Sequence, residues 1–143
     1  MFLGTHYPRL DDKGRLVLPA KFRDGLEGGV VLTRGQDRSV VLWPADEFAS
    51  YATRVREASR SDAKARAYSR VLFSGASDEV PDKQGRITIP TALREYADLD
   101  GECAVVGNHG TVEIWNPQAW SSYLATQEQV FADLSEEVVP GLF

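Results

Sequence analysis

The sequence of 143 residues contains a single cysteine, Cys103, which excludes an intrachain disulfide bond. It has no apolar run approaching the roughly 20 residues that a helix needs to cross a bilayer. The first residues lack a basic segment followed by a long apolar stretch, so nothing indicates a secretory signal peptide. Together these absences predict a cytoplasmic protein that does not bind membranes.

Patterns typical of catalytic or metal centres are also absent. His6 and His109 are far apart, and neither falls in a spacing typical of metal ligands. Cys103 lies on a predicted strand, where a small buried residue is commoner than a nucleophile. Asp78 and Glu79 are adjacent, and adjacent side chains of an extended segment point apart. Because phosphate-binding loops and dinucleotide fingerprints are missing too, we expect no enzyme, no cofactor, no metal and no small-molecule substrate.

The charge of the chain is low overall but unevenly distributed. The net charge of −5 taken alone argues against nucleic acid as a partner. Residues 1–71, however, carry 13 Lys and Arg against 9 Asp and Glu, whereas residues 72–143 carry 3 against 12. Such asymmetry can mark an interaction surface, although fluctuation along the chain is the alternative.

The strongest pattern in the sequence is an internal repeat. Residues 11–23 align with residues 82–94 at a shift of 71, and residues 2–4 align with 73–75 at the same shift. Further on, at a shift of 72, residues 42–43 align with 114–115. The matching positions of the central block are Asp11/Asp82, Gly14/Gly85, Arg15/Arg86, Leu16/Ile87, Leu18/Ile89, Pro19/Pro90 and Arg23/Arg94. Three ordered blocks favour duplication, so we divide the chain into a first repeat, 1–71, and a second repeat, 72–143.

Each repeat predicts the same order of elements. Asp and Gly at the first and fourth positions of residues 11–14 and 82–85 are typical of a type I turn. A strand follows at 15–18 or 86–89, and Pro19 or Pro90 then marks the start of a short helix. A hairpin comes next, with strands at 30–33 and 39–43 or at 103–106 and 111–115, and then a further helix. Residues 53–70 are expected to be helical and to join the repeats, and residues 135–143 to be loosely ordered.

One repeat of about 70 residues is marginal as a folding unit. We therefore expect the two repeats to pack together as a pseudo-two-fold unit. Six aromatic residues that recur in register are expected to complete the core, with a platform for stacking nucleic-acid bases as the alternative. These residues are Trp43, Phe48, Tyr51, Trp115, Trp120 and Tyr123.

The Asp-x-x-x-Arg turn, the strand of residues 15–19 and the tandem arrangement resemble the MraZ family, and each repeat resembles an AbrB-type swapped-hairpin module. The resemblance extends from Phe2 to about residue 130. It implies an α+β, β-rich fold of two tandem swapped-hairpin β-barrel modules with flanking helices. It further implies a nucleoid-associated bacterial regulator that forms rings and binds short direct repeats in the promoter of a cell-division and cell-wall gene cluster.

The family's turn residues fall on Asp11, Arg15, Asp82 and Arg86. An arginine at the start of a strand can form paired hydrogen bonds to a phosphate or to a guanine edge. The aspartate four residues earlier can hold that guanidinium or cap the turn, which Gly14 and Gly85 help to shape. Supporting cations, each of which could equally be a solvated surface charge, are Arg9, Lys13, Lys21, Arg23, Arg34, Arg38 and Lys83.

Two functions of different classes follow from these patterns. The first is a sequence-specific DNA-binding regulator, expected to be a repressor, that binds double-stranded DNA as a ring-like homo-oligomer. The second is a protein–protein assembly module or an antitoxin-like adaptor without its own operator. A structural Asp–Arg pair with no ligand would fit the second function.

Overall fold

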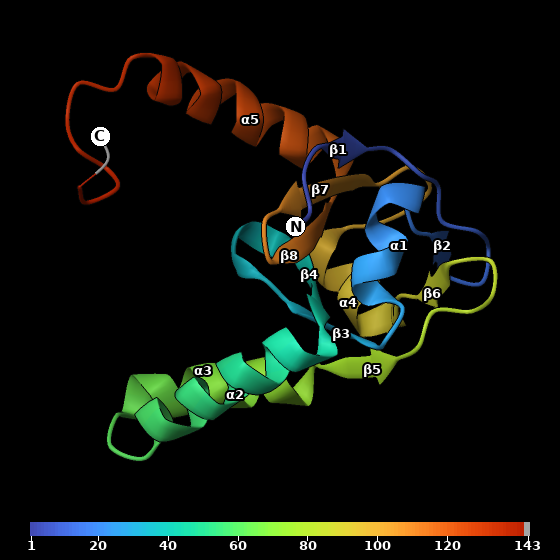
Figure 1. Ribbon diagram of the computed structural model, residues 1–143, viewed down its shortest axis with the longest axis horizontal. Helices are drawn as coiled ribbons and strands as arrows, with labels where there is room; N and C mark the ends of the chain where they lie inside the picture. The colour runs from blue at the N-terminus through green and yellow to red at the C-terminus, as the bar shows by residue number, and fades with distance from the viewer. Residues whose placement is uncertain (142–143) are drawn as a thin grey trace.

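The computed structural model describes residues 1–141 and consists of two antiparallel sheets and five α-helices (Figure 1). A six-stranded sheet has the order β1-β7-β8-β4-β3-β5, and β2 and β6 form a separate ladder. The strands are β1 (Thr5–His6), β2 (Arg15–Val17), β3 (Val30–Arg34), β4 (Val40–Pro44), β5 (Ser77–Glu79), β6 (Arg86–Thr88), β7 (Ala104–Asn108) and β8 (Thr111–Trp115). The helices are α1 (Ala20–Leu26), α2 (Ala45–Ser59), α3 (Ala63–Ser74), α4 (Thr91–Ala97) and α5 (Pro117–Ala132), with a 3-10 turn at Gln36–Arg38.

The strands of the two repeats are interleaved within these sheets. The first repeat's β1 pairs with β7 of the second repeat, and the second repeat's β5 pairs with β3 of the first. The central pair, β4 with β8, also joins the repeats, as does β2 with β6. The α+β class and the tandem swapped arrangement are therefore confirmed.

The expected β-barrel is wrong in one respect, because the six-stranded sheet stays open. Its end strands are short: β1 has two residues and β5 has three. Within residues 1–141 neither pairs with the other, so the sheet does not close. Such short edges present few backbone groups with which a ladder could continue.

The register of the ladders places a pseudo-two-fold axis through the molecule. Leu16 pairs with Ile87, its own equivalent, while Arg15 pairs with Thr88 and Val17 with Arg86. In the large sheet, Val41 pairs with Glu113, the residue 72 positions later. Exchange of the repeats therefore maps each of these ladders onto itself.

The main hydrophobic core lies between the large sheet and the layer formed by the β2–β6 ladder, α1 and α4. Its fully buried residues come from both repeats, including Leu16, Phe22 and Leu32 from the first and Ile87 and Leu93 from the second. One repeat alone would leave half of this core open to water, which explains why strands are exchanged.

The remaining helices form two arms on the side opposite the β2–β6 ladder: α2 and α3 make the first arm, and α5 makes the second (Figure 1). The expected helix at 53–70 is broken: α2 ends at Ser59 and α3 begins at Ala63, where the Asp62 carboxylate accepts a hydrogen bond of 2.9 Å from the Lys64 N–H. An N-terminal Asp cap of this kind starts a new helix. The second arm, α5, has no buried residue, and residues 133–141 contain neither helix nor strand. Within the described part of the chain, no helix has the length and apolarity required to cross a membrane.

Candidate nucleic-acid interface

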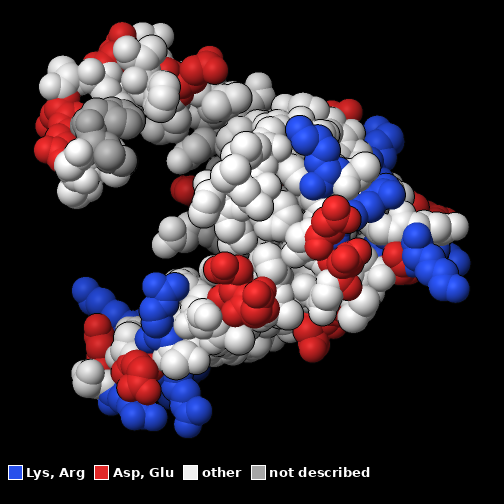
Figure 2. All heavy atoms as spheres, in the orientation of Figure 1, with Lys and Arg blue, Asp and Glu red and all other residues white. Residues whose placement is uncertain are grey.

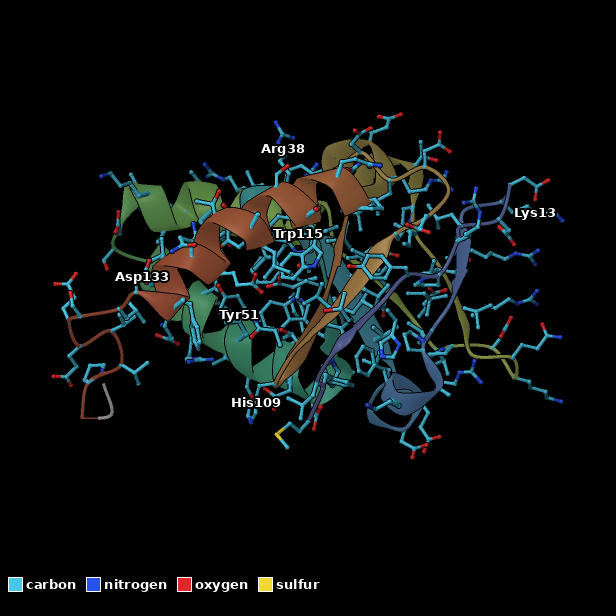
Figure 3. The ribbon with its side chains drawn as sticks, turned by 90° about the horizontal axis from the view of Figure 1, so that it is seen from above. Lys13, Arg38, Tyr51, His109, Trp115 and Asp133 are labelled. Atoms are coloured by element: carbon cyan, nitrogen blue, oxygen red, sulfur yellow. The ribbon has the colours of Figure 1, made fainter. Side chains whose placement is uncertain are left out.

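Residues 11–15 and 82–86, which we call the paired turns, lie at the two ends of the short β2–β6 ladder, at the end of the molecule away from the helical arms. Figure 3 shows Lys13 of the first turn at the opposite end from Asp133. A backbone hydrogen bond joins each turn to the residue that follows the opposite repeat's strand: the Leu18 N–H donates to the Gly85 carbonyl at 2.8 Å, and the Ile89 N–H donates to the Gly14 carbonyl at 2.9 Å. The duplication thus brings two separate sequence motifs to one surface.

In the first turn, one carboxylate both closes the turn and holds the arginine. Asp11 Oδ1 accepts hydrogen bonds from the backbone N–H groups of Lys13 (2.9 Å) and Arg15 (2.8 Å). Its Oδ2 accepts from Arg15 Nε at 2.7 Å. The backbone N–H of Arg15 is the largest cause of an Asp11 pKa below its usual value, against an opposing effect of burial. Asp11 is therefore an anion that orients the arginine.

The second turn repeats this geometry. Asp82 Oδ1 accepts from the N–H groups of Gln84 and Arg86, each at 2.9 Å, and Oδ2 accepts from Arg86 Nε at 2.7 Å. The pKa of Asp82 is lowered as well, first by the Arg86 backbone N–H and then by the Arg86 side chain. Both of the roles considered for the aspartates, capping and orienting, occur in the same residue.

The two arginines keep donor groups free. Their bonds to aspartate use Nε alone, and within residues 1–141 no protein atom accepts a hydrogen bond from Nη1 or Nη2 of Arg15 or Arg86. Their side chains are 34% and 32% exposed. Each guanidinium therefore presents oriented donors to solvent, an arrangement suited to a phosphate or a guanine edge.

The turn glycines lie against arginines of the opposite repeat. Gly14 and Gly85 have φ angles of 77° and 75°, the left-handed region that favours glycine. A Cβ built on Gly14 would lie 1.5 Å from Nη1 of Arg94 in α4, and one built on Gly85 would lie 2.5 Å from Nε of Arg23 in α1. Arg23 was predicted as a supporting cation of the DNA interface, whereas Arg94 was not, although the repeat aligns the two residues.

Only some of the predicted supporting cations lie at the paired turns; the others lie elsewhere in the molecule. Lys13 and Lys83 are exposed in the turns, and Lys21 is exposed on α1. Arg9, by contrast, lies against Gly101 in the loop before β7. Two more are held elsewhere: Arg34 donates to the Val71 carbonyl at 2.8 Å, and the guanidinium of Arg38 lies 4.8 Å from the ring centre of Tyr96.

Charge at this end of the molecule is mixed, with a cationic excess. The paired turns, α1 and α4 carry seven cations against five carboxylates, which are Lys13, Arg15, Lys21, Arg23, Lys83, Arg86 and Arg94 against Asp11, Asp12, Asp24, Asp82 and Glu95. Glu79 accepts a hydrogen bond from the Thr88 N–H at 2.6 Å, and burial raises its pKa despite that bond. Figure 2 shows blue Lys and Arg side chains at this end, with red ones among them.

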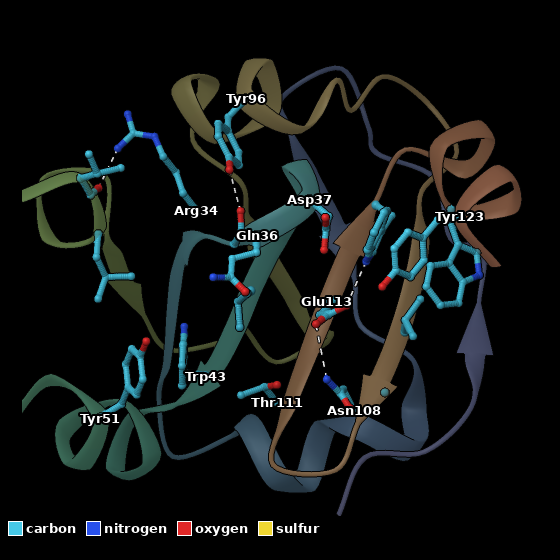
Figure 4. A pocket seen from close by; sticks show the side chains of 18 of the residues that line it. Arg34, Gln36, Asp37, Trp43, Tyr51, Tyr96, Asn108, Thr111, Glu113 and Tyr123 are labelled. Carbon is cyan, nitrogen blue, oxygen red and sulfur yellow. Dashed lines mark hydrogen bonds between the residues drawn. The ribbon is translucent and has the colours of Figure 1, made fainter. Parts of the chain in front are cut away.

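A second feature, which we call the aromatic groove, is a cavity of about 750 Å³ between the two helical arms. It is lined by Trp43 and Tyr51 on one side and by Trp115, Trp120 and Tyr123 on the other (Figure 4). Trp43 and Tyr51 stack with ring centres 4.7 Å apart, and those of Trp115 and Tyr123 are 5.0 Å apart.

The recurring aromatics were expected to complete the core, and this expectation is wrong for the main core, although Trp115 is buried. None of the six belongs to the main core cluster, and Trp115 and Trp120 contribute to a separate small cluster. Aliphatic side chains together with Phe2 and Phe22 already fill the main core, so Trp43 and Trp115 lie near the ends of the central strands β4 and β8, and the other four lie on α2 and α5.

Comparison with known proteins agrees with the repeat structure. The family model for the MraZ protein, described as antitoxin-like, matches the chain twice, at residues 1–71 and 72–139. This chain belongs to the MraZ family. Its curated relatives include proteins named Transcriptional regulator MraZ from Salinispora tropica (61% identical over 142 residues, 99% of this chain and 100% of the relative) and from Clavibacter michiganensis subsp. michiganensis (60% over 143 residues, 100% of both). Another, from Parafrankia sp., is 58% identical over 142 residues, 99% of each chain.

The MraZ assignment therefore covers both repeats and identifies the chain as a member of a family of transcriptional regulators. The names of these relatives describe regulation of transcription and no enzymatic activity.

Proposed function

We propose that this MraZ protein is a sequence-specific DNA-binding repressor, which uses the paired turns to bind direct repeats in the promoter of a cell-division and cell-wall gene cluster. The observation that carries the proposal is the state of Arg15 and Arg86. Each is held at Nε by its own aspartate, while within residues 1–141 its Nη groups donate to no protein atom and its side chain is about one third exposed.

Orientation of the guanidinium before binding matters for recognition. A free arginine side chain loses about 2 kcal/mol of rotamer entropy when it is fixed in one geometry. The bonds from Asp11 and Asp82 have already restricted Arg15 and Arg86, so less of this cost falls on the DNA complex. The donors that remain match the paired acceptors of a guanine edge or a phosphate.

The local cationic excess also reconciles DNA binding with a net charge of −5. No Lys or Arg follows Arg94, so the acidic excess of the second repeat lies largely in the last third of the sequence. That part includes α5, which lies away from the paired turns (Figures 1 and 2). Association with the nucleoid would follow from such DNA binding.

Self-association into a ring is the second part of the proposal. The arm formed by α2, α3 and the residues between them (45–74) carries six Lys and Arg against four Asp and Glu, whereas α5 carries one carboxylate and no cation. Contact between the α5 of one chain and the aromatic groove and basic arm of the next would be head to tail, the type of contact that closes into rings. A ring adds avidity, because several pairs of turns meet successive DNA repeats.

The alternative function, an antitoxin-like adaptor, rests on the same aromatic groove and on the family description. In that case the groove would hold a partner protein and the paired turns would have no DNA ligand. The two functions differ in what a substitution of the turn arginines does.

Fluorescence anisotropy with labelled DNA from upstream of the protein's own gene distinguishes them. Arg15→Ala and Arg86→Ala are each expected to cost about 1–3 kcal/mol of binding free energy, a loss in affinity of about 5- to 150-fold. Arg38→Ala, which removes the same charge on another surface, serves as the control and should change affinity little. Affinity for the wild-type protein should also fall steeply with rising salt.

Unchanged affinity in the Arg15→Ala/Arg86→Ala double variant, with an intact circular dichroism spectrum, would contradict the proposed interface. Failure of the wild-type protein to bind this DNA more tightly than a scrambled sequence would favour the adaptor.

A further inference from the structure

We infer that Arg23 and Arg94 are positioning residues that act across the repeats: each supports the turn of the opposite repeat and so couples the two DNA-contacting arginines. The role in DNA binding rests on the proposed function, whereas the mechanical coupling does not.

The contacts across the repeats are reciprocal. Nη1 of Arg94, in the second repeat, occupies the space beside Gly14 in the first, where a Cβ would come within 1.5 Å of it. Arg23, in the first repeat, lies in the same way beside Gly85 in the second, with Nε, Cδ and Cζ all within 3.0 Å of a Cβ position. The pseudo-two-fold axis relates these two contacts.

Each of the two arginines is also anchored within its own repeat. Arg23 Nε donates to the Leu18 carbonyl at 3.0 Å, at the end of the strand that leads into α1. Arg94 Nη2 donates to Thr91 Oγ1 at 2.8 Å, in the first turn of α4. Each guanidinium is thus hydrogen-bonded within its own repeat and packed against the opposite turn, so it transmits the position of its own helix to the turn that it covers.

Burial of the glycines supports this role. Asp12 and Lys13 are exposed, as expected for a tight turn at the surface, but the next residue, Gly14, is buried. The second turn has the same pattern, with Lys83 and Gln84 exposed and Gly85 buried. Because Arg94 and Arg23 are the side chains nearest to these glycines, they form the cover.

The consequence for DNA contact is a crossed dependence. Gly14 directly precedes Arg15, so Arg94 helps to fix the backbone from which Arg15 extends, and Arg23 does the same for Arg86. Asp11 and Asp82 act only within their own turns. Loss of Arg94 should therefore disturb the first turn and spare the second, although Arg94 belongs to the second repeat.

Hydrogen–deuterium exchange with mass spectrometry tests this dependence on the full chain without DNA. In Arg94→Ala, amide exchange should accelerate in peptides that contain Lys13 and Arg15 and stay unchanged in peptides that cover 82–86. Arg23→Ala should give the opposite pattern. Peptides from β3 and β4 report on the core and should not change. Acceleration in both turns alike, in the turn of the same repeat only, or in neither turn would overturn the inference.

Affinity for the upstream DNA then separates positioning from direct contact. We expect Arg94→Ala to weaken binding about fivefold or more in the wild-type and Arg86→Ala backgrounds, but less than about twofold in the Arg15→Ala background, because residues that act together are not additive. Arg94→Lys keeps the charge and loses the planar group, so it should behave as Arg94→Ala does. Equal effects in both backgrounds would mean that Arg94 contacts DNA itself.

The two proposals fail in different ways. A crossed exchange pattern together with unchanged DNA affinity in the Arg15→Ala/Arg86→Ala double variant would leave the coupling intact and remove the DNA interface. Loss of DNA affinity in that double variant together with an uncrossed exchange pattern would do the reverse.

Discussion

Leu16 of β2 pairs with Ile87 of β6 directly on the pseudo-two-fold axis, and the two side chains are 0% and 1% exposed. Each residue is the sequence equivalent of the other, so the core is closed at this point by a residue and its own duplicate. The paired turns extend from the two ends of this ladder, which makes the stability of the core and the geometry of the proposed DNA interface parts of one unit.

Truncation at this pair should therefore destabilise the whole chain. Leu16→Ala and Ile87→Ala are each expected to lower the free energy of unfolding by about 2–5 kcal/mol, the range for large-to-small substitutions in a core. Because one core spans both repeats, urea unfolding followed by circular dichroism and by tryptophan fluorescence should give one coincident transition. Val17→Ala, at a neighbouring position that is 44% exposed, is the control and should cost about 0.5 kcal/mol or less. Separate transitions for the two probes would contradict a shared core.

The turn glycines should be sensitive to a single methyl group. Gly14→Ala and Gly85→Ala place a Cβ at positive φ and against an arginine, so each should lower the melting temperature by about 2–4 °C or more, which corresponds to a cost of about 1 kcal/mol. Gly28→Ala is the matched control, because a Cβ there meets no atom within 4 Å. Differential scanning calorimetry measures the change, and equal melting temperatures for Gly14→Ala and Gly28→Ala would show that the turn tolerates a side chain.

Much of the local structure could be predicted from the sequence because its signals are local. Pro19 and Pro90 cap the starts of α1 and α4, and the turns end at Gly14 and Gly85 as the Asp and Gly positions indicate. Most observed ends of the hairpin strands lie within one residue of the predicted ends. Cys103, for example, was predicted within a strand and lies directly before β7.

The parts that could not be predicted depend on contacts between distant residues. Nothing near Thr5 in the sequence indicates that its strand pairs with Val106. The position of Trp43 and Trp115 beside a groove depends on where α2 and α5 leave the sheet, which hydrophobic pattern alone does not specify. The alignment of Arg94 with Arg23 could have indicated a shared role, but only the folded chain shows that Arg94 lies against Gly14 of the opposite repeat.

Replacement of the turn aspartates by asparagine should reduce specificity more than affinity. In Asp11→Asn the amide oxygen can still accept the N–H groups of Lys13 and Arg15, but the amide nitrogen cannot accept from Arg15 Nε. The arginine would then lose its orientation while the surface gains positive charge. We expect a smaller ratio of affinities for upstream and scrambled DNA, with scrambled DNA bound at least as tightly as by the wild type. An unchanged ratio would mean that Asp11 only caps the turn.

The thiol of Cys103 should be unreactive in the folded protein. Cys103 is fully buried, and burial, aided by the charge of Glu102, raises its pKa to about 11. A raised thiol pKa keeps the reactive thiolate scarce at neutral pH, so modification by Ellman's reagent should stay slow from about pH 7 to 9. Unfolding in urea should release the thiol and restore fast modification. Rapid reaction at pH 7 without denaturant would place Cys103 at an accessible surface.

Assembly should depend on the exposed apolar face of α5. The helix has no buried residue, yet four of its apolar side chains are 39–70% exposed and recur at spacings of seven residues: Tyr123, Leu124, Val130 and Phe131. Such a stripe is typical of a helix that packs against a partner. Phe131→Asp should therefore lower the mass measured by light scattering coupled to size exclusion, whereas Val80→Asp, at an equally exposed apolar position near β5, should leave it unchanged.

Salt separates the two contributions to this contact. Attraction between the basic α2–α3 arm and the carboxylates in and after α5 (Glu128, Asp133, Glu136 and Glu137) is screened at high salt, whereas apolar burial is retained, so the wild-type assembly should weaken with salt without dissociating fully. The mass should exceed that of a dimer at moderate salt, because head-to-tail contacts leave both ends of a dimer open to further chains. A wild-type mass near 15.8 kDa at both moderate and high salt would refute the ring, and the avidity that a ring gives to DNA binding would be lost with it.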